Sequence, residues 1–145
     1  KQGLEFIDTD KNIEKKNLMS ITEIFKKKGE KFFRKEEEKE VLKLLKKNDC
    51  VIALGGGAFI NENIRNYILK NALSIWLDID LENLNKRIKF NKKRPLLDRN
   101  NNKKKINDLY TQRKNIYKLA NHKIDCTNLT KQNIAKKIIN FYEKN

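Results

Sequence analysis

The sequence predicts an α/β fold in which a parallel sheet is covered by helices on both faces. Short apolar runs rich in β-forming residues alternate with helical patterns along the chain, and such alternation is typical of parallel sheets. One of these runs, 50–54, is followed directly by Gly55, Gly56 and Gly57, three of the five glycines in the chain. Ligands bind at the carboxyl ends of parallel strands, so the position of the triplet favours a ligand surface over a flexible connector.

Four strands and the helices between them account for the chain. Strands are expected at 4–7, 50–54, 73–78 and 123–126, and the run at 50–54 is expected to be fully buried. A further helix is expected around Ile13, and Gly29 is expected to separate two others. Capping residues and apolar spacing predict the remaining helices at 20–29, 30–48, 61–69, 80–88, 106–120 and 130–141.

Composition limits the classes of function. The 145 residues suffice for one domain, 1–145, and carry a formal net charge of +15. Most of this charge comes from lysines scattered among other polar residues, which indicates a solvated surface rather than a specific nucleic-acid groove. No stretch is apolar enough to span a membrane, and two distant cysteines at expected strands are typical of reduced thiols in a cytoplasmic protein.

Acidic residues follow the first expected strand. Asp8 and Asp10 are two residues apart at its carboxyl end, where one can serve a metal or phosphate and the other a substrate hydroxyl. The alternative is that Asp10 only caps the helix that follows.

Two further features point to a site. Arg34 follows two phenylalanines at the start of a helix, a setting suited to binding a planar carboxylate, although a surface arginine is the ordinary alternative. The segment 91–105 contains the only proline and a wholly polar stretch, which predicts a mobile lid. His122, the only histidine, lies in a polar loop with no partner set for catalysis and is expected to be a surface residue.

A set of motifs occurs together and in one order: Asp8-Thr9-Asp10, Gly29-Glu30-Lys31-Phe32-Phe33-Arg34 with Glu37, Leu54 to Ala58, Arg94-Pro95-Leu96-Leu97, and Arg113 three residues after Tyr110. Each motif is common, but the ordered set resembles the shikimate kinase family and covers essentially the whole chain. The resemblance implies the P-loop fold of nucleoside-monophosphate kinases, a three-layer α/β/α arrangement with a central parallel sheet and a mobile lid at 91–105.

The resemblance also implies a reaction, the transfer of the ATP γ-phosphoryl group to the 3-hydroxyl of shikimate in aromatic amino-acid biosynthesis. Arg34 and Arg113 would bind the shikimate carboxylate, and Asp10 would orient or deprotonate the attacking hydroxyl. Backbone N–H groups of Gly55, Gly56 and Gly57 would line the remaining edge. The other implied roles concern ATP and Mg²⁺: Asp8 would hold the metal through water, Arg94 would close over the transferring phosphoryl, and Arg87 would lie near the nucleotide.

The chain departs from the family pattern at its start. The first strand of the family, its GxxGxGK[ST] phosphate loop and the helix after it do not occur in the printed sequence. We therefore expect the stretch 1–145 alone to be poorly stable and catalytically silent, whether the loop lies upstream or was lost. The alternatives are a gluconate-type kinase and a substrate-binding pseudoenzyme; the protein is otherwise expected to be a cytoplasmic monomer.

Overall fold

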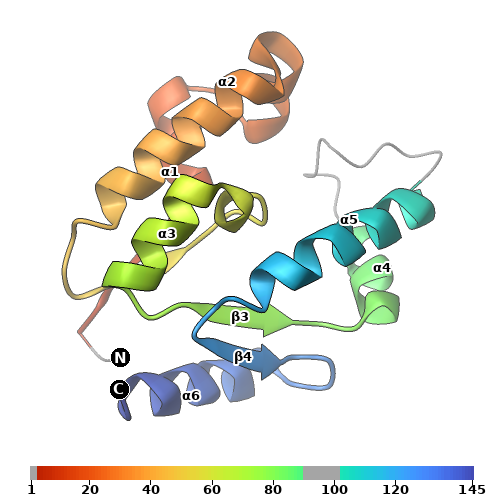
Figure 1. Cartoon of the computed structure of the whole chain (residues 1–145). Coiled ribbons are helices and arrows are strands. Elements are labelled where there is room, and N and C mark those ends of the chain that lie inside the picture. Colours follow the sequence, from red (N-terminus) through yellow and green to blue (C-terminus); the bar gives the residue numbers. More distant parts are fainter. Residues whose placement is uncertain (1–2, 90–101) are drawn as a thin grey trace. The chain divides into compact units, whose positions relative to one another are not determined.

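The computed structural model describes residues 3–89 and 102–145 (Figure 1). These residues form two units, one comprising 3–72 and the other comprising 73–89 with 102–145. Each unit contains one pair of parallel strands with helices in the connection between them, which confirms the α/β class. That 1–145 folds as a single domain stays a prediction.

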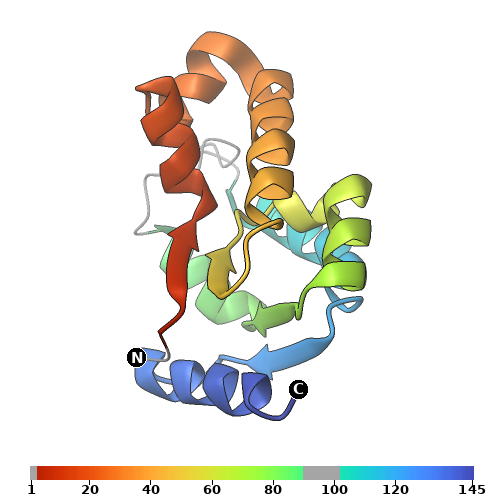
Figure 2. The same cartoon turned by 90° about the vertical axis from the view of Figure 1, so that its left-hand side faces the viewer.

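The first unit is built on β1 (Glu5–Asp8) and β2 (Cys50–Ala53), which pair in parallel and end at the partners Asp8 and Ala53. Between them run α1 (Thr9–Asn17) and α2 (Ile21–Leu44), which pack together as a hairpin (Figure 2). After β2 the chain forms the short 3-10 helix η1 (Ala58–Ile60) and then α3 (Glu62–Asn71). Because the strands are parallel, the residues after β1 and the residues after β2 meet at one edge.

The predicted helix boundaries at Ser20, Gly29 and Asn61 are confirmed, whereas the helix predicted to run to 48 already ends at Leu44. Ser20 and Glu23 form a capping box, and the Asn61 side chain accepts a hydrogen bond from the Ile64 N–H at 3.2 Å. Gly29 interrupts α2 with φ 82° and ψ 165°, a backbone conformation that side chains other than hydrogen disfavour. The expected break between two helical segments is therefore present, and the second segment starts just before Arg34.

A small apolar core fixes the hairpin. Ile13 of α1 is 1% exposed and packs with Ile24 and Phe33 of α2, which are 0% and 4% exposed. Burying side chains of this size contributes about 1.5–3 kcal/mol each. These contacts fix α2 against α1 and so fix the direction in which the side chains that follow Phe33 on α2 point.

The prediction that the 50–54 strand is fully buried is wrong for the described residues. Val51 is 41% exposed, and its cross-strand partner Phe6 is 68% exposed. Both side chains lie on the same face of the β1–β2 pair, because paired residues in a sheet point to the same side. A continuous apolar run does not reveal which face of a strand will be covered.

The second unit contains the parallel pair β3 (Ile75–Asp78) and β4 (His122–Asp125). The helices are α4 (Leu81–Lys89), α5 (Asn102–Tyr117) and α6 (Lys131–Tyr142). Lys123 of β4 pairs with Asp78 of β3 at 2.8 Å, and this hydrogen bond raises the pKa of Lys123 above its ordinary value. The start of the strand pair is joined by the Asn121 side chain, which accepts from the N–H and hydroxyl of Ser74 at 2.9 and 2.6 Å.

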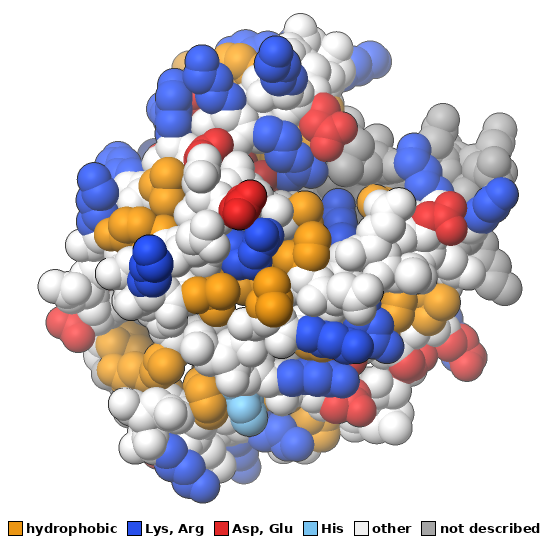
Figure 3. All heavy atoms as spheres, in the orientation of Figure 1, with side chains coloured by type: hydrophobic (Ala, Val, Ile, Leu, Met, Phe, Trp, Pro, Cys, Tyr) orange, Lys and Arg blue, Asp and Glu red, His pale blue; other side chains and the backbone are white. Residues whose placement is uncertain are grey.

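Several remaining predictions concern single residues. His122, expected to be a surface residue, is only partly exposed and stacks on Phe141 with ring centroids 4.1 Å apart. Both cysteines are free; Cys126 is buried and Cys50 is half-buried. Figure 3 shows lysine and arginine side chains dispersed over the visible face, with acidic side chains among them.

Among the described residues, no helix combines the length and apolar character needed to cross a membrane. The predicted lid at 91–105 lies largely outside the described residues, and Arg94 lies outside them entirely.

Candidate active site

The Asp8-Thr9-Asp10 segment turns the end of β1 into the first turn of α1. Asp8 rather than Asp10 caps the helix: its Oδ1 accepts hydrogen bonds from the Asp10 and Lys11 N–H groups at 3.0 and 3.2 Å. The alternative that Asp10 serves as the cap is therefore wrong, because the helix already begins at Thr9. Asp10 instead lies in the first turn, where the helix dipole favours a negative charge.

The backbone of Gly55 lies directly beneath two carboxylates. A Cβ atom placed on Gly55 would lie 2.8 Å from Asp10 Oδ1 and 3.0 Å from Glu37 Oε1. Both distances are shorter than ordinary van der Waals contact, so a side chain at position 55 would push these carboxylates away and the missing Cβ of glycine lets them approach the turn closely. Asp10 and Glu37 therefore converge on one point from α1 and α2.

The guanidinium group of Arg34 covers the other end of the turn. A Cβ atom on Gly57 would overlap Arg34 Nη1 and would lie 2.7 Å from Cζ and 2.8 Å from Nη2. Gly57 itself has φ −96°, an ordinary value, so close approach rather than backbone conformation requires a glycine here. The glycines after β2 thus form a floor on which Arg34, Asp10 and Glu37 meet.

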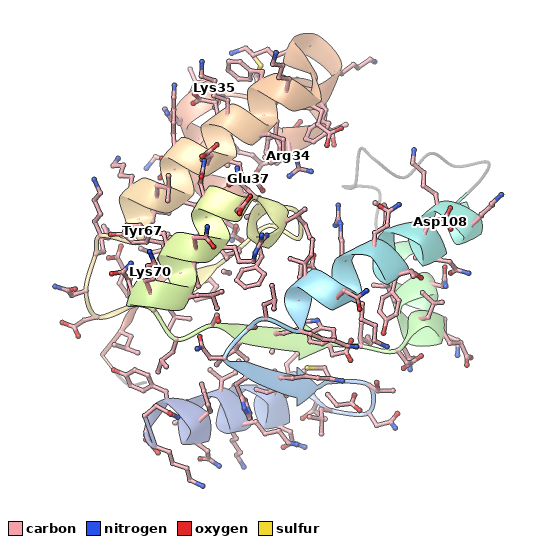
Figure 4. All side chains as sticks on the ribbon, in the orientation of Figure 1. Arg34, Lys35, Glu37, Tyr67, Lys70 and Asp108 are labelled. Carbon is pink, nitrogen blue, oxygen red and sulfur yellow. The ribbon has the colours of Figure 1, made fainter. Side chains whose placement is uncertain are left out.

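Arg34 is held by groups of its own helix. Its Nη1 donates to Glu37 Oε2 at 2.7 Å, and its Nε and Nη2 donate to Glu30 Oε1 at 3.3 and 3.4 Å. Figure 4 shows Arg34 and Glu37 close together on α2. Glu37 is 2% exposed, so its hydrogen bond to Arg34 offsets part of the cost of burying a carboxylate, whereas the Glu30 side chain is 51% exposed and the contact with it is weak. The Phe33 ring, 5.2 Å from Arg34 Cζ, flanks the cation as the sequence predicts.

Further polar contacts keep α2 in place beneath this cluster. Glu36 pairs with Lys16 of α1 at 2.8 Å, and that hydrogen bond lowers the pKa of Glu36 below its ordinary value. Glu40 accepts from Asn12 of α1 at 3.2 Å. On the other side, Glu38 accepts from the side-chain amide of Asn61, at the start of α3, at 3.1 Å. The helix that carries Arg34 and Glu37 is therefore tied to both of its neighbours.

The sequence did not reveal two residues of this cluster. Glu37 belongs to one of the ordered motifs, but no role is predicted for it. Its spacing of three residues from Arg34 on one helix face nevertheless indicates an ion pair. Thr9, between the two aspartates, is 0% exposed and hydrogen-bonds to Ala53 at the end of β2 and to Gly55 beyond it. Nothing in its local sequence predicts these partners, which are 44 and 46 residues away.

Three further predicted site residues belong to other parts of the chain. Arg113 is on α5 in the second unit and is partly exposed. Arg87 is on α4, but its side chain lies outside the described residues, as does all of Arg94. Their predicted roles stay predictions.

The described residues contain no group of three or more His, Cys, Asp or Glu side chains able to enclose a metal ion. Magnesium usually keeps several waters and takes only one or two carboxylates together with substrate phosphates. Asp8 at the end of β1 fits that habit, since a single carboxylate at this edge is enough for water-mediated contact.

A small arrangement of this kind suits a polar ligand with one negative charge. A guanidinium group offers donors to a carboxylate, and the Asp10 carboxylate offers acceptors to hydroxyl groups. The family model described as shikimate kinase matches residues 1–143. The chain belongs to the shikimate kinase family.

Individual relatives agree with the family match. The shikimate kinase of Bartonella henselae is 43% identical over 136 residues, covering 94% of this chain and 65% of the relative. That of Bacillus subtilis is 41% identical over 137 residues, covering 93% of this chain and 73% of the relative. The chain thus spans just under two thirds of the length of its Bartonella relatives.

Solved structures show the same shikimate kinase fold. The shikimate kinase from Acinetobacter baumannii in complex with shikimate matches with a TM-score of 0.92 and 31% identity, covering 98% of this chain and 80% of that one. The enzyme from Aquifex aeolicus matches with a TM-score of 0.83 and 34% identity, covering 97% and 82%. These matches confirm the predicted fold class of the nucleoside-monophosphate-kinase type.

Proposed function

We propose that the protein binds shikimate at the Arg34, Asp10 and Gly55–Gly57 cluster and transfers the γ-phosphoryl group of ATP to its 3-hydroxyl. The observation that carries the proposal is the convergence of the Arg34 guanidinium, paired with Glu37, and the Asp10 carboxylate over a glycine turn whose missing Cβ atoms leave room for them. This arrangement matches a small ring that bears one carboxylate and several hydroxyl groups. Membership of the shikimate kinase family and the likeness to a structure in complex with shikimate support it.

Each residue has a physical part in the proposal. Arg34, steadied by Glu37, presents charged donors to the substrate carboxylate, and Arg113 supplies a second cation. Asp10, in the first turn of α1, accepts from the ring hydroxyls and orients the one that attacks. Glu37 stays with Arg34, because the geometry already satisfies it by a 2.7 Å hydrogen bond.

The nucleotide is the phosphoryl donor, and Mg²⁺ offsets the charge of its phosphates when bound. We propose that Asp8 holds this ion through water, that Arg94 closes over the transferring group from 91–105, and that Arg87 lies near the nucleotide. We also propose that the protein acts as a monomer in the cytoplasm, with no specific nucleic-acid or membrane partner.

A pair of ligands tests the substrate. Calorimetric titration of the protein with shikimate and with its methyl ester, which lacks the negative charge, should show weaker binding of the ester. In Arg34→Ala the two ligands should bind with nearly equal, low affinity, since the carboxylate has lost its partner. A surface variant, Lys35→Ala, should retain the preference of the wild type. Equal binding of both ligands by the wild-type protein would contradict the site.

The reaction itself is tested by coupled ADP release with shikimate and Mg-ATP. The assay uses the chain 1–145 and the same chain with any residues that its gene encodes ahead of Lys1. Activity that depends on shikimate in the longer protein supports the proposal. ADP release that requires gluconate instead of shikimate, or no ADP release with either compound, would refute the proposal.

A further inference from the structure

Thr9 is the most deeply buried polar residue at the candidate site, with an exposed fraction of 0%. It lies between Asp8 and Asp10, but its side chain is turned towards β2. Its hydroxyl donates to the carbonyl of Ala53 at 3.1 Å and accepts from the N–H of Gly55 at 3.3 Å. One hydroxyl therefore uses both of its hydrogen-bonding capacities on the chain that leads into the glycine turn.

The positions of these two hydrogen bonds show what they contribute to the connection between β1 and β2. The β1–β2 ladder ends at the pair Asp8 and Ala53, because β1 turns into α1 at the next residue. Beyond that point, the Thr9 hydroxyl bonds the two groups of the β2 chain that flank Leu54. The side chain thus extends the contact between β1 and β2 into the site.

A second consequence concerns the glycine turn itself. The N–H of Gly55 is occupied by Thr9 in this structure, so Gly55 serves the site by lacking a Cβ and by holding its position. Asp10 Oδ1 and Glu37 Oε1 lie 2.8 and 3.0 Å from the point that a Cβ of Gly55 would occupy, so a shift of Gly55 by a few tenths of an ångström would change the space available to these carboxylates. The geometry of the whole floor therefore depends on the bonds that hold Gly55.

We propose that Thr9 is a positioning residue, whose hydroxyl fixes the Gly55–Gly57 turn in the conformation that accepts the substrate. The inference rests on the proposed function, because it deepens the account of the same site. Thr9 does not touch the substrate. It acts by raising the population of the binding-competent turn, and the apparent affinity of a ligand falls in proportion when that population falls.

The test compares a substitution that removes the hydroxyl and keeps the shape with one that keeps the hydroxyl and removes the methyl group. Thr9→Val keeps the shape of the side chain but can neither donate nor accept, and Thr9→Ser keeps the hydroxyl. Thr9→Val should raise the dissociation constant and the KM for shikimate by about 5-fold or more, with a smaller change in kcat. Thr9→Ser should recover most of this loss, and Thr22→Val, on an exposed residue of α2, controls for the substitution itself.

Amide hydrogen exchange gives a readout that does not depend on substrate. The Gly55 N–H should exchange slowly in the wild type and in Thr9→Ser, and faster in Thr9→Val relative to the amides of β1. If Thr9→Val does not fold, exchange of the Gly55 N–H in the wild type and in Thr9→Ser still tests the inference. Fast exchange of this N–H in the wild type would overturn it.

The outcomes also separate the inference from the proposed function. Failure of the wild-type protein to bind shikimate would refute the proposed function, and the exchange comparison would then decide the role of Thr9 alone. Folded Thr9→Val that binds shikimate like the wild type, or Thr9→Ser that is as weak as Thr9→Val, would overturn the inference while leaving the function intact.

Discussion

Adding one methyl group to Gly57 should disable the site through Arg34. The new Cβ would overlap Nη1 and would lie 2.7 Å from Cζ, whereas ordinary van der Waals contact begins near 3.4 Å. The guanidinium group is the end of a flexible side chain, so it will move rather than force the backbone apart. Gly57→Ala should therefore fold, because φ −96° at this position suits alanine.

The loss of affinity and of stability follows from the contacts that Arg34 gives up when it moves. Its displacement breaks the 2.7 Å hydrogen bond to Glu37, a carboxylate whose side chain is 2% exposed. Loss of a hydrogen bond to a charged group costs about 1.5–3 kcal/mol. If the substrate carboxylate loses a comparable contact, its affinity should fall about 10-fold to 100-fold. Calorimetric titration with shikimate measures this change, and urea unfolding measures the accompanying loss of stability.

A double-mutant cycle makes the reasoning refutable. In an Arg34→Ala background, Gly57→Ala should have almost no further effect on affinity, because no guanidinium group remains to be displaced. Gly3→Ala provides a control methyl group at a position with nothing within 4 Å, although its φ of +74° adds local strain. Additive effects of Gly57→Ala and Arg34→Ala would show that the glycine is required for another reason.

The remaining predictions concern the other charged groups. Arg34→Lys should weaken shikimate binding measurably, and Arg113→Ala should weaken it by about 10-fold or more. The reason is that a lost charged hydrogen bond costs about 1.5–3 kcal/mol. Unchanged affinity in calorimetric titration would remove these residues from the site. Arg94→Ala should lower kcat much more than it raises the KM for shikimate, since its contact forms in the transition state, and the reverse pattern in steady-state kinetics would assign it to substrate binding. Because Lys16 lowers the pKa of Glu36, their pair stabilises the fold above the ordinary carboxyl pKa of 4.5, and this contribution is lost as the pH falls through the depressed value. Urea unfolding of Lys16→Met should therefore show a smaller loss of stability on acidification than the wild type, and parallel losses in both proteins would contradict this account.

Local signals in the sequence determined most of the secondary structure. The capping box at Ser20, the cap at Asn61 and the break at Gly29 are settled within a few residues, so reading them requires no knowledge of the fold. The order of strands and helices then determined the parallel class, because a connection that runs through helices is long enough to return the chain to the same end of the sheet. The ordered motifs, finally, were specific enough to indicate the shikimate kinase family.

Only the tertiary structure decided how the site is assembled. Arg34 donates a hydrogen bond to Glu37 instead of facing solvent alone. The side chains of Asp10, Arg34 and Glu37 lie against Gly55 and Gly57, and this depends on distances between segments remote in sequence. The exposure of Val51 could not be read from its apolar neighbours, since burial is decided by what covers a face and not by the strand itself. The role of Thr9 was hidden for the same reason: its hydroxyl is bonded to groups 44 and 46 residues away, and a contact at that separation leaves no local pattern in the sequence.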